Sequence, residues 1–273
     1  MARKIFQTKY IISGNVVERY SFEKDQFKGF EPRNKKGKNR NGLFKEKNRC
    51  DVIRRARGTV MRSINANPCL NKFLTLTFKD NVTDLDYANS EFKKFIKRVN
   101  YKVLKTKKSK LKYVAVIEFQ ERGAIHYHMI CDLPYIDVNE LQQIWGLGFI
   151  KLNKIKGNKE KFGSSECDNV GAYVCKYMTK ENTDDRLRGR KMYLMSRNLD
   201  KPTEILVGNE EIDLIAQAYG FSDPLESLAI KKSIISYMFY NEYCGTVIYH
   251  QYNLKRMRNR KIMQNKELHN ISI

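Results

Sequence analysis

Two histidines, His126 and His128, are separated by a single residue in the apolar segment 124–130. In a β-strand alternate side chains share a face, so both imidazoles would point the same way while Tyr127 points into the core. Two imidazoles side by side on a rigid strand form a chelating pair for a metal ion. The alternative is that both histidines are ordinary polar residues on a solvated sheet face.

Glu118 would complete this pair if the hairpin between the two strands has a particular register. If residues 121–123 form a three-residue loop with Gly123 left-handed, Glu118 lies directly opposite His126. A two-residue loop would instead place Phe119 opposite His126 and turn Glu118 to the other face. Two imidazoles and a carboxylate suit a divalent metal with open positions, Mg²⁺ or Mn²⁺.

Tyr173 and Tyr177 are four residues apart in segment 168–180, which predicts a helix with both phenols on one face. Lys176 and Lys180 each follow a tyrosine by three residues. A neighbouring ammonium favours the phenolate and can hold a phosphate, and a metal opposite can polarise that phosphate. Together these groups could catalyse transesterification of a phosphodiester. The alternative is a helix whose rings pack and whose lysines reach into solvent.

The charge of the chain favours a polyanionic partner. Among 273 residues, 52 Lys and Arg face 30 Asp and Glu, a net charge of +22. This favours nucleic acid over an acidic membrane surface, with a merely soluble basic protein as the alternative. A basic helix is expected at 44–65. Its arginines either contact the DNA backbone or form an ordinary solvated helix face. The proposed DNA-binding residues are Arg54, Arg55, Arg57 and Arg62.

The six cysteines contain no CxxC pair, so neither a zinc knuckle nor a disulfide framework is indicated. We identify no signal peptide and no apolar stretch long enough for a membrane span. We therefore expect a reducing cytoplasm and no membrane partner.

The periodicity of the chain predicts an α+β fold, an antiparallel sheet with helices packed on one side. We expect a hairpin at 4–22, a basic loop at 28–42, strands at 73–78, 112–120, 124–131, 149–155, 191–196 and 246–252, and helices at 44–65, 83–105, 137–145, 168–180, 210–219 and 224–240. The expected regions are 1–69 (hairpin, basic loop and basic helix), 70–204 (catalytic core) and 205–273 (a mostly helical extension with a basic tail).

Three motifs, in order, resemble those of the HUH endonuclease superfamily, most closely its rolling-circle replication initiators. They are the strand 73–78, the segment 123–130 with its two histidines, and the doubled Tyr-x-x-Lys of 173–180. The third motif and the Trp-Gly-x-Gly-Phe of 145–149 are similar to the initiators of small single-stranded DNA phages and plasmids. The resemblance covers roughly residues 70–200.

The resemblance implies a ferredoxin-like or RNA-recognition-like five-stranded antiparallel sheet, with the metal on its central strands and Glu118 as third ligand. It implies that a tyrosine attacks a DNA phosphate, leaving a 5′-phosphotyrosine and a 3′-hydroxyl primer. A second tyrosine can then release a closed circle. The substrate would be single-stranded or locally melted origin DNA in a bacterial cytoplasm, with the gene on a phage, plasmid or integrated element. Because no GxxxxGK[ST] phosphate loop is present, we expect no nucleotide cofactor, and a host helicase and polymerase as partners.

Two alternatives remain open at this point. A related HUH transposase or relaxase would share the chemistry, although relaxases usually present three histidines, and here His250 and His269 lie in the tail. A non-catalytic nucleic-acid binder would be expected to expose aromatics on its sheet. The expected open face instead carries Glu118, His126 and His128.

Overall fold

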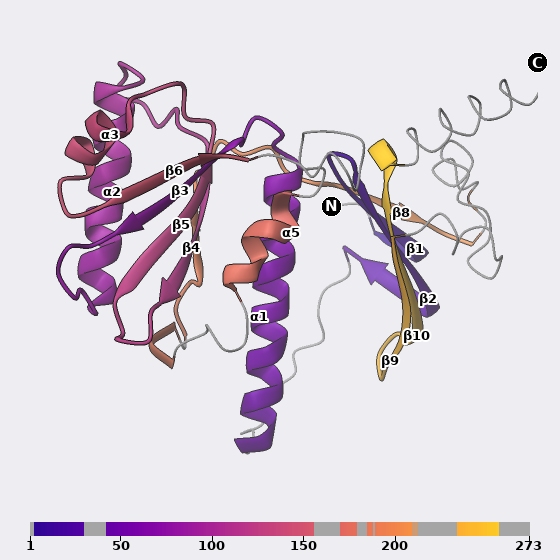
Figure 1. Cartoon of the computed structure of the whole chain (residues 1–273). Coiled ribbons are helices and arrows are strands. Elements are labelled where there is room, and N and C mark those ends of the chain that lie inside the picture. The colour runs from indigo at the N-terminus through magenta and orange to yellow at the C-terminus, as the bar shows by residue number, and fades with distance from the viewer. Residues whose placement is uncertain are drawn as a thin grey trace, which may run out of the picture. The chain divides into compact units, whose positions relative to one another are not determined.

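The computed structural model describes residues 3–29, 42–155, 170–178, 185–187, 189–209, 211 and 234–256. The chain forms two compact units, which we call the central unit (Arg40–Lys201) and the terminal unit (Met1–Asn39 with Pro202–Ile273). Each unit contains a five-stranded antiparallel sheet, so the fold is α+β (Figure 1). These units do not coincide with the expected boundaries after residues 69 and 204, because the basic helix belongs to the central unit and the two ends of the chain share the other.

The central sheet has the strand order β6-β3-β5-β4-β7, and all its neighbours are antiparallel. Its strands are β3 (Lys72–Thr77), β4 (Tyr113–Phe119), β5 (Ile125–Cys131), β6 (Ile150–Lys154) and β7 (Tyr193–Met195). β5 occupies the middle position, and every residue of β5 is buried. The two histidines of β5 are therefore held by the most enclosed strand of the sheet.

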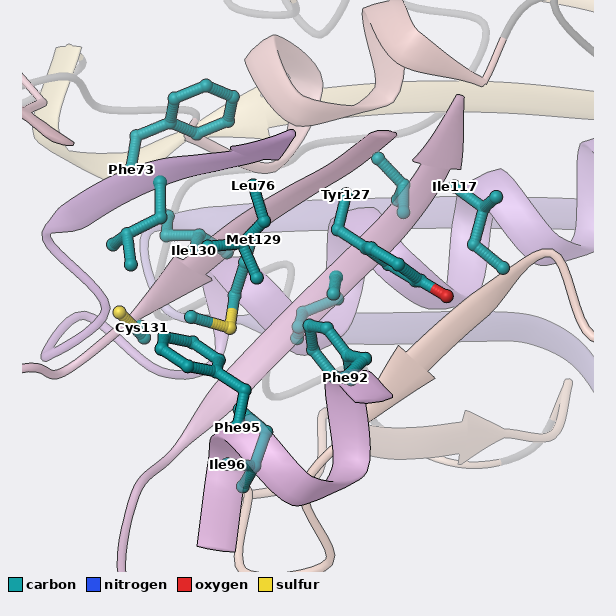
Figure 2. Close-up of a cluster of buried hydrophobic side chains, with 14 of the residues drawn as sticks. Phe73, Leu76, Phe92, Phe95, Ile96, Ile117, Tyr127, Met129, Ile130 and Cys131 are labelled. Atoms are coloured by element: carbon teal, nitrogen blue, oxygen red, sulfur yellow. The ribbon is translucent and has the colours of Figure 1, made fainter. Parts of the chain in front are cut away.

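One face of this sheet is covered by α2 (Leu85–Lys102), with α3 (Val138–Trp145) beside it (Figure 1). Asp84 caps α2 by accepting from the backbone N–H groups of Asp86 and Tyr87. Figure 2 shows the apolar stripe of α2 against the sheet, where the ring of Phe92 stacks on Tyr127 at 4.6 Å between centroids. Tyr127 faces the core as expected, so its neighbours His126 and His128 must face the other way.

The opposite face is covered as well, by α1 (Gly42–Asn65), α5 (Val170–Val174) and the short 3₁₀ turn η1 (Cys175–Tyr177). The expectation of helices on one side only is therefore wrong. α5 lies directly on α1, since a Cβ on Gly171 would come within 2.4 Å of the Met61 carbonyl oxygen. The Gly171 N–H also donates to Asn65 Oδ1 at 3.0 Å. This close contact fixes the tyrosine segment on the histidine side of the sheet.

The terminal unit has the strand order β8-β1-β2-β10-β9. Its strands are β1 (Lys4–Ser13), β2 (Val16–Lys28), β8 (Thr203–Val207), β9 (Ile235–Asn241) and β10 (Gly245–Asn253). A small core gathers on one sheet face around Tyr10, Val17 and Tyr252, all fully buried. The expected hairpin at 4–22 is confirmed, with Gly14 and Asn15 in its turn.

The C-terminal region differs most from expectation. Residues 235–240, expected at the end of a helix spanning 224–240, lie in the edge strand β9, so the expected helical extension is wrong in this part. Its Tyr, Phe and Ile side chains suit a pleated surface. The strand β8 was not expected at all, whereas the strand at 246–252 is confirmed. The expected helix 210–219 and the start of helix 224–240 lie almost wholly outside the described residues.

The remaining expected elements of the central unit are confirmed within a few residues at their ends. The exception is the helix expected at 168–180, whose described part, 170–178, contains one and a half turns of α-helix followed by a 3₁₀ turn. η2 (Asp185–Leu187) adds one more 3₁₀ turn. In the part of the chain that the structure describes, no helix combines the length and apolarity that a membrane crossing requires.

Candidate active site

The hairpin between β4 and β5 has the register that places Glu118 directly opposite His126. The predicted three-residue loop is confirmed, because the Gln120 N–H donates to the Ala124 carbonyl at 2.9 Å and closes the pair that flanks it. Gly123 sits at the third loop position with φ 84°, a left-handed conformation that a side chain would disfavour. The sequence of the turn therefore sets which face of β4 carries the carboxylate.

Glu118 and the two histidines share one face, but they are engaged differently. His128 Nε2 lies 2.5 Å from Glu118 Oε2, and its Nδ1 lies 3.2 Å from the Thr75 hydroxyl on the other neighbouring strand. His126 Nε2 is buried and has no hydrogen-bond partner. The two histidines are only 7% and 6% exposed, so the alternative of a solvated sheet face is wrong.

The protonation states follow from these contacts. The hydrogen bond from His128 lowers the pKa of the Glu118 carboxyl below its usual value despite partial burial, which favours the carboxylate. Burial, and then the nearby His128, lower the pKa of His126 below its ordinary 6.5, against the opposing effect of Glu118. His126 is therefore neutral at pH 7, and its unpartnered Nε2 is available for a ligand.

The donor types fit a divalent metal, but their present arrangement does not gather them around one point. Within the described residues, no group of three or more His, Cys, Asp or Glu side chains is placed to hold a metal ion. The Glu118 carboxylate is instead hydrogen-bonded to His128. What fits is the chemistry of the set: two imidazoles, one carboxylate, and an orphaned buried nitrogen on His126.

Both tyrosines lie over the histidine face. The ring of Tyr177 stacks on His128 with centroids 3.8 Å apart and on Phe73 at 5.7 Å. Tyr173 meets Phe73 edge-on at 5.5 Å. Phe73 thus packs against both phenol rings, and Figure 2 shows it on the face of the sheet opposite α2. The phenols and imidazoles therefore share one side of the sheet, as the chemistry requires.

The two phenols differ in their surroundings. Burial, followed by a hydrogen bond with Tyr173, raises the pKa of Tyr177 to about 12, so its phenolate is harder to form. Tyr173 is 40% exposed, and the Lys176 ammonium lies 5.4 Å from its ring centroid. Lys180 lies outside the described residues. Of the two rings, Tyr173 is the one open to an incoming strand.

The four arginines expected to bind DNA lie on α1, the helix that carries α5. Arg54, Arg55 and Arg57 are exposed, and Arg62 is partly buried. Arg54 pairs with Asp51 one turn earlier at 2.9 Å, and the Arg55 Nε donates to the Asp51 carbonyl. These contacts stay within α1 and place neither Arg54 nor Arg55 at the histidines.

Thr75 and Phe73 are site residues to which the sequence analysis assigned no role. Both belong to β3, whose register pairs Thr75 with His128 and Thr77 with His126. The signal was present in the sequence, because alternate residues of strand 73–78 must share a face. The face on which Phe73 and Thr75 lie, and the histidine beside each, depend on the pairing of β3 with β5. These two strands are not joined by a turn that would set their register.

Residues 71–182 match the model of a protein family that is described as replication-associated protein ORF2. The match begins at the start of β3 and includes Glu118, His126, His128, Tyr173 and Tyr177. No curated protein and no solved structure matches the chain. The matched segment, which carries the whole candidate site, supports a protein of the rolling-circle replication initiator type.

Proposed function

We propose that the protein is a replication initiator that nicks and rejoins single-stranded origin DNA through a tyrosine. The observation that carries this proposal is the stack of Tyr177 on His128, with Tyr173 beside it and Glu118 bonded to the same imidazole. A nucleophile, a ligand set and a lysine therefore lie on one sheet face. A protein that only bound nucleic acid would have no need of a carboxylate–imidazole pair under its aromatic rings.

In the proposed reaction a phenolic oxygen bonds to phosphorus and the bond from phosphorus to the 3′-oxygen breaks. The phenol proton passes to water, and the departing 3′-oxygen takes up a proton. The products are a 5′-phosphotyrosine and a 3′-hydroxyl, which serves as primer. Reversal by a 3′-hydroxyl restores the phosphodiester, so no external energy source is needed.

Tyr173 is proposed as the first nucleophile and Tyr177 as the second. Tyr173 is more exposed, and the Lys176 ammonium beside its ring is proposed to hold the scissile phosphate. The raised pKa of Tyr177, about 12, favours its neutral form until its surroundings change. Such an order suits one attack at initiation and another after a round of synthesis.

His126, His128 and Glu118 are proposed to hold Mg²⁺ or Mn²⁺, with His126 Nε2 as the nitrogen already free to bind. A bound divalent ion would polarise the scissile phosphate and offset its charge. Thr75 would orient His128 through its Nδ1, the usual role of a partner on the second ring nitrogen of a metal-binding histidine.

Origin DNA, a host helicase and a host polymerase are the proposed partners, in a bacterial cytoplasm. A transposase or relaxase would share the site but act on a hairpin, a transposon end or a transfer origin. Cleavage of origin-like, hairpin and transposon-end strands separates these functions.

The test is to incubate the protein with origin-like, hairpin and transposon-end single strands and Mn²⁺, and to look for a covalent adduct on a denaturing gel. We expect an adduct with an origin-like strand, lost on chelation and absent from the double variant Tyr173→Phe with Tyr177→Phe. An adduct that survives in the double variant would assign the nucleophile elsewhere. Strand binding without any adduct would leave a non-catalytic binder.

A further inference from the structure

The edge strand β6 continues the histidine face outward. Thr77, which lies beside His126, exchanges two backbone hydrogen bonds with Phe149, at 3.0 and 3.1 Å, just before β6 begins. Thr75, which lies beside His128, is paired with Lys151. Because paired residues in a sheet share a face, Phe149 and Lys151 point to the same side as the histidines. Phe149 lies two strands from His126, about 10 Å at the backbone.

Phe149 is an exposed aromatic that the fold holds rigidly. Its side chain is 64% exposed. The residue before it, Gly148, has no room for a side chain, since a Cβ there would come within 2.2 Å of the Thr77 carbonyl oxygen. The Trp145 indole also donates to that oxygen at 3.0 Å, which ties the end of α3 to β3. The ring is thus held in solvent by a segment that is fixed at both ends. Exposing this apolar area is unfavourable, and packing within the protein does not explain it.

The surroundings of Phe149 are cationic and rich in amides. An open hollow beside it is lined by Lys79 and by the amide side chains of α3, namely Asn139, Gln142 and Gln143. Lys151 is exposed, and within the described residues it has no ion-pair partner. Amides can both donate to and accept from the edge of a base, an aromatic ring can stack on its face, and ammoniums attract the backbone.

We propose that Phe149, Lys151 and the hollow beside Phe149 form a base-binding subsite for single-stranded DNA, next to the scissile phosphate. Phe149 stacks on one base, Lys151 contacts a phosphate of the strand, and the amides of α3 meet the edge of the stacked base. The subsite holds the strand at the β6 edge of the sheet, from which a phosphate approaches the histidine face. This inference rests on the proposed function for the identity of the scissile phosphate, but base stacking can be measured without any cleavage.

The test compares binding of a polythymidine single strand of about 16 nucleotides with binding of the same backbone lacking its bases, both in chelator. Phe149→Ala is expected to weaken polythymidine binding about 5- to 150-fold, the effect of losing one base–aromatic stack. Phe149→Ala should leave binding of the abasic strand unchanged. The variant Phe149→Trp keeps an aromatic ring and should bind polythymidine as the wild type does. The matched control is Tyr101→Ala on α2, an aromatic 62% exposed but on the helix that covers the other sheet face.

Equal affinity of Phe149→Ala and the wild type for polythymidine would overturn the proposal, and so would an equal loss on both strands. Lys151→Gln should reduce the salt slope of binding by about 0.7, the contribution of one phosphate contact to a single strand, and an unchanged slope would remove Lys151 from the subsite. A wild type that binds polythymidine through Phe149 yet forms no adduct with any origin strand would contradict the nicking function and keep the subsite. A wild type that binds no single strand would overturn both.

Discussion

The two sheets each contain a glutamate, a histidine and tyrosines on neighbouring strands, yet they combine them differently. In the terminal unit Glu18 is 1% exposed and accepts from the hydroxyls of Tyr20 and Tyr249, both at 3.1 Å. His250 is equally buried, but the register pairs it with Arg19, so it points to the face opposite Glu18. The carboxylate is occupied by two phenols and never meets the imidazole.

In the central unit the register instead places the glutamate and both histidines on the same face of the sheet. Glu118 is paired with His126, and its carboxylate bonds the imidazole of His128 two residues further along the strand. The same residue types thus form a structural cluster in one sheet and a candidate catalytic cluster in the other. Because side chains alternate along a strand, a shift of one residue decides between the two outcomes.

The sharpest test of this contrast is to remove histidines from each sheet. His126→Ala or His128→Ala is expected to abolish cleavage of an origin strand while DNA binding remains, because each removes a proposed metal ligand. His250→Gln should leave the cleavage rate intact. Gel assays of cleavage with Mn²⁺, with binding measured in parallel, separate these outcomes. A His128→Ala protein that still cleaves would remove the metal from the mechanism.

The tyrosines give the next largest effect. Tyr173→Phe is expected to remove nearly all first-round adduct, because phenylalanine has no hydroxyl to attack the phosphate and any adduct that remains must form at Tyr177. Tyr177→Phe should spare the first adduct and impair the second transfer, since burial and Tyr173 hold its phenol neutral. Tyr20→Phe in the terminal unit is the control and should affect neither step. The adduct sites are read by mass spectrometry of the linked peptide, and an adduct mostly on Tyr177 would reverse the proposed order.

The two hairpin glycines test whether register matters beyond stability. Gly123 and Gly14 both have positive φ, 84° and 57°, so a valine at either position should destabilise the protein by about 1–2 kcal/mol. Only Gly123→Val is expected to slow cleavage as well, because it lies in the loop that places Glu118. Thermal unfolding and cleavage rates of the two variants give the comparison. Equal losses of activity would show that the turn acts through stability alone.

The dependence on pH follows from the lowered pKa values of His126 and Glu118. When a group has a lower pKa in the folded protein than in the unfolded chain, the folded protein is most stable at a pH above the unfolded-state pKa. That stability is lost as the pH falls through the pKa of the folded state. His126 therefore becomes protonated only at a pH below 6.5, and the acid limb of Mn²⁺-dependent cleavage should lie below 6.5. A limb at or above the ordinary histidine pKa in a pH–rate profile would contradict this assignment.

The smallest effect is expected from the basic helix. Arg57→Gln should weaken binding of single-stranded DNA slightly and lower its salt slope by about 0.7 if the residue contacts one phosphate. Lys9→Gln in the terminal unit serves as the comparison, because the Lys9 ammonium lies over the Tyr20 ring at 5.0 Å. A slope that falls for Lys9→Gln and not for Arg57→Gln would move the DNA contact from α1 to the terminal sheet.

The sequence predicted the site where a local rule governs the geometry. Gly123 fixed the loop length, the loop fixed the register, and the register brought Glu118 to His126. The tyrosine segment was predicted to be a helix over 168–180, and within the described residues it is shorter and ends in a 3₁₀ turn. Its position above the histidines depends on α1, a contact between distant segments that no periodicity encodes.

The terminal unit was less predictable for the same reason. Residues 235–241 form a strand because β10 pairs with them, and their mixture of aromatic and aliphatic residues is also compatible with a buried helix. β8 is a short strand that pairs with β1, although most of the chain lies between the two strands. The union of the two chain ends into one unit is a tertiary property, and it explains why boundaries drawn along the sequence did not match the two units.

The absence of a side chain at Gly171 has a mechanical consequence. The backbone of α5 rests on the Met61 carbonyl with no atom between them to act as a spacer, and the Asn65 amide oxygen holds the Gly171 N–H. The two helices therefore cannot slide along each other without first separating. A displacement of the arginine-bearing helix would carry the phenols with it, so a ligand that moves α1 would also move the proposed nucleophile.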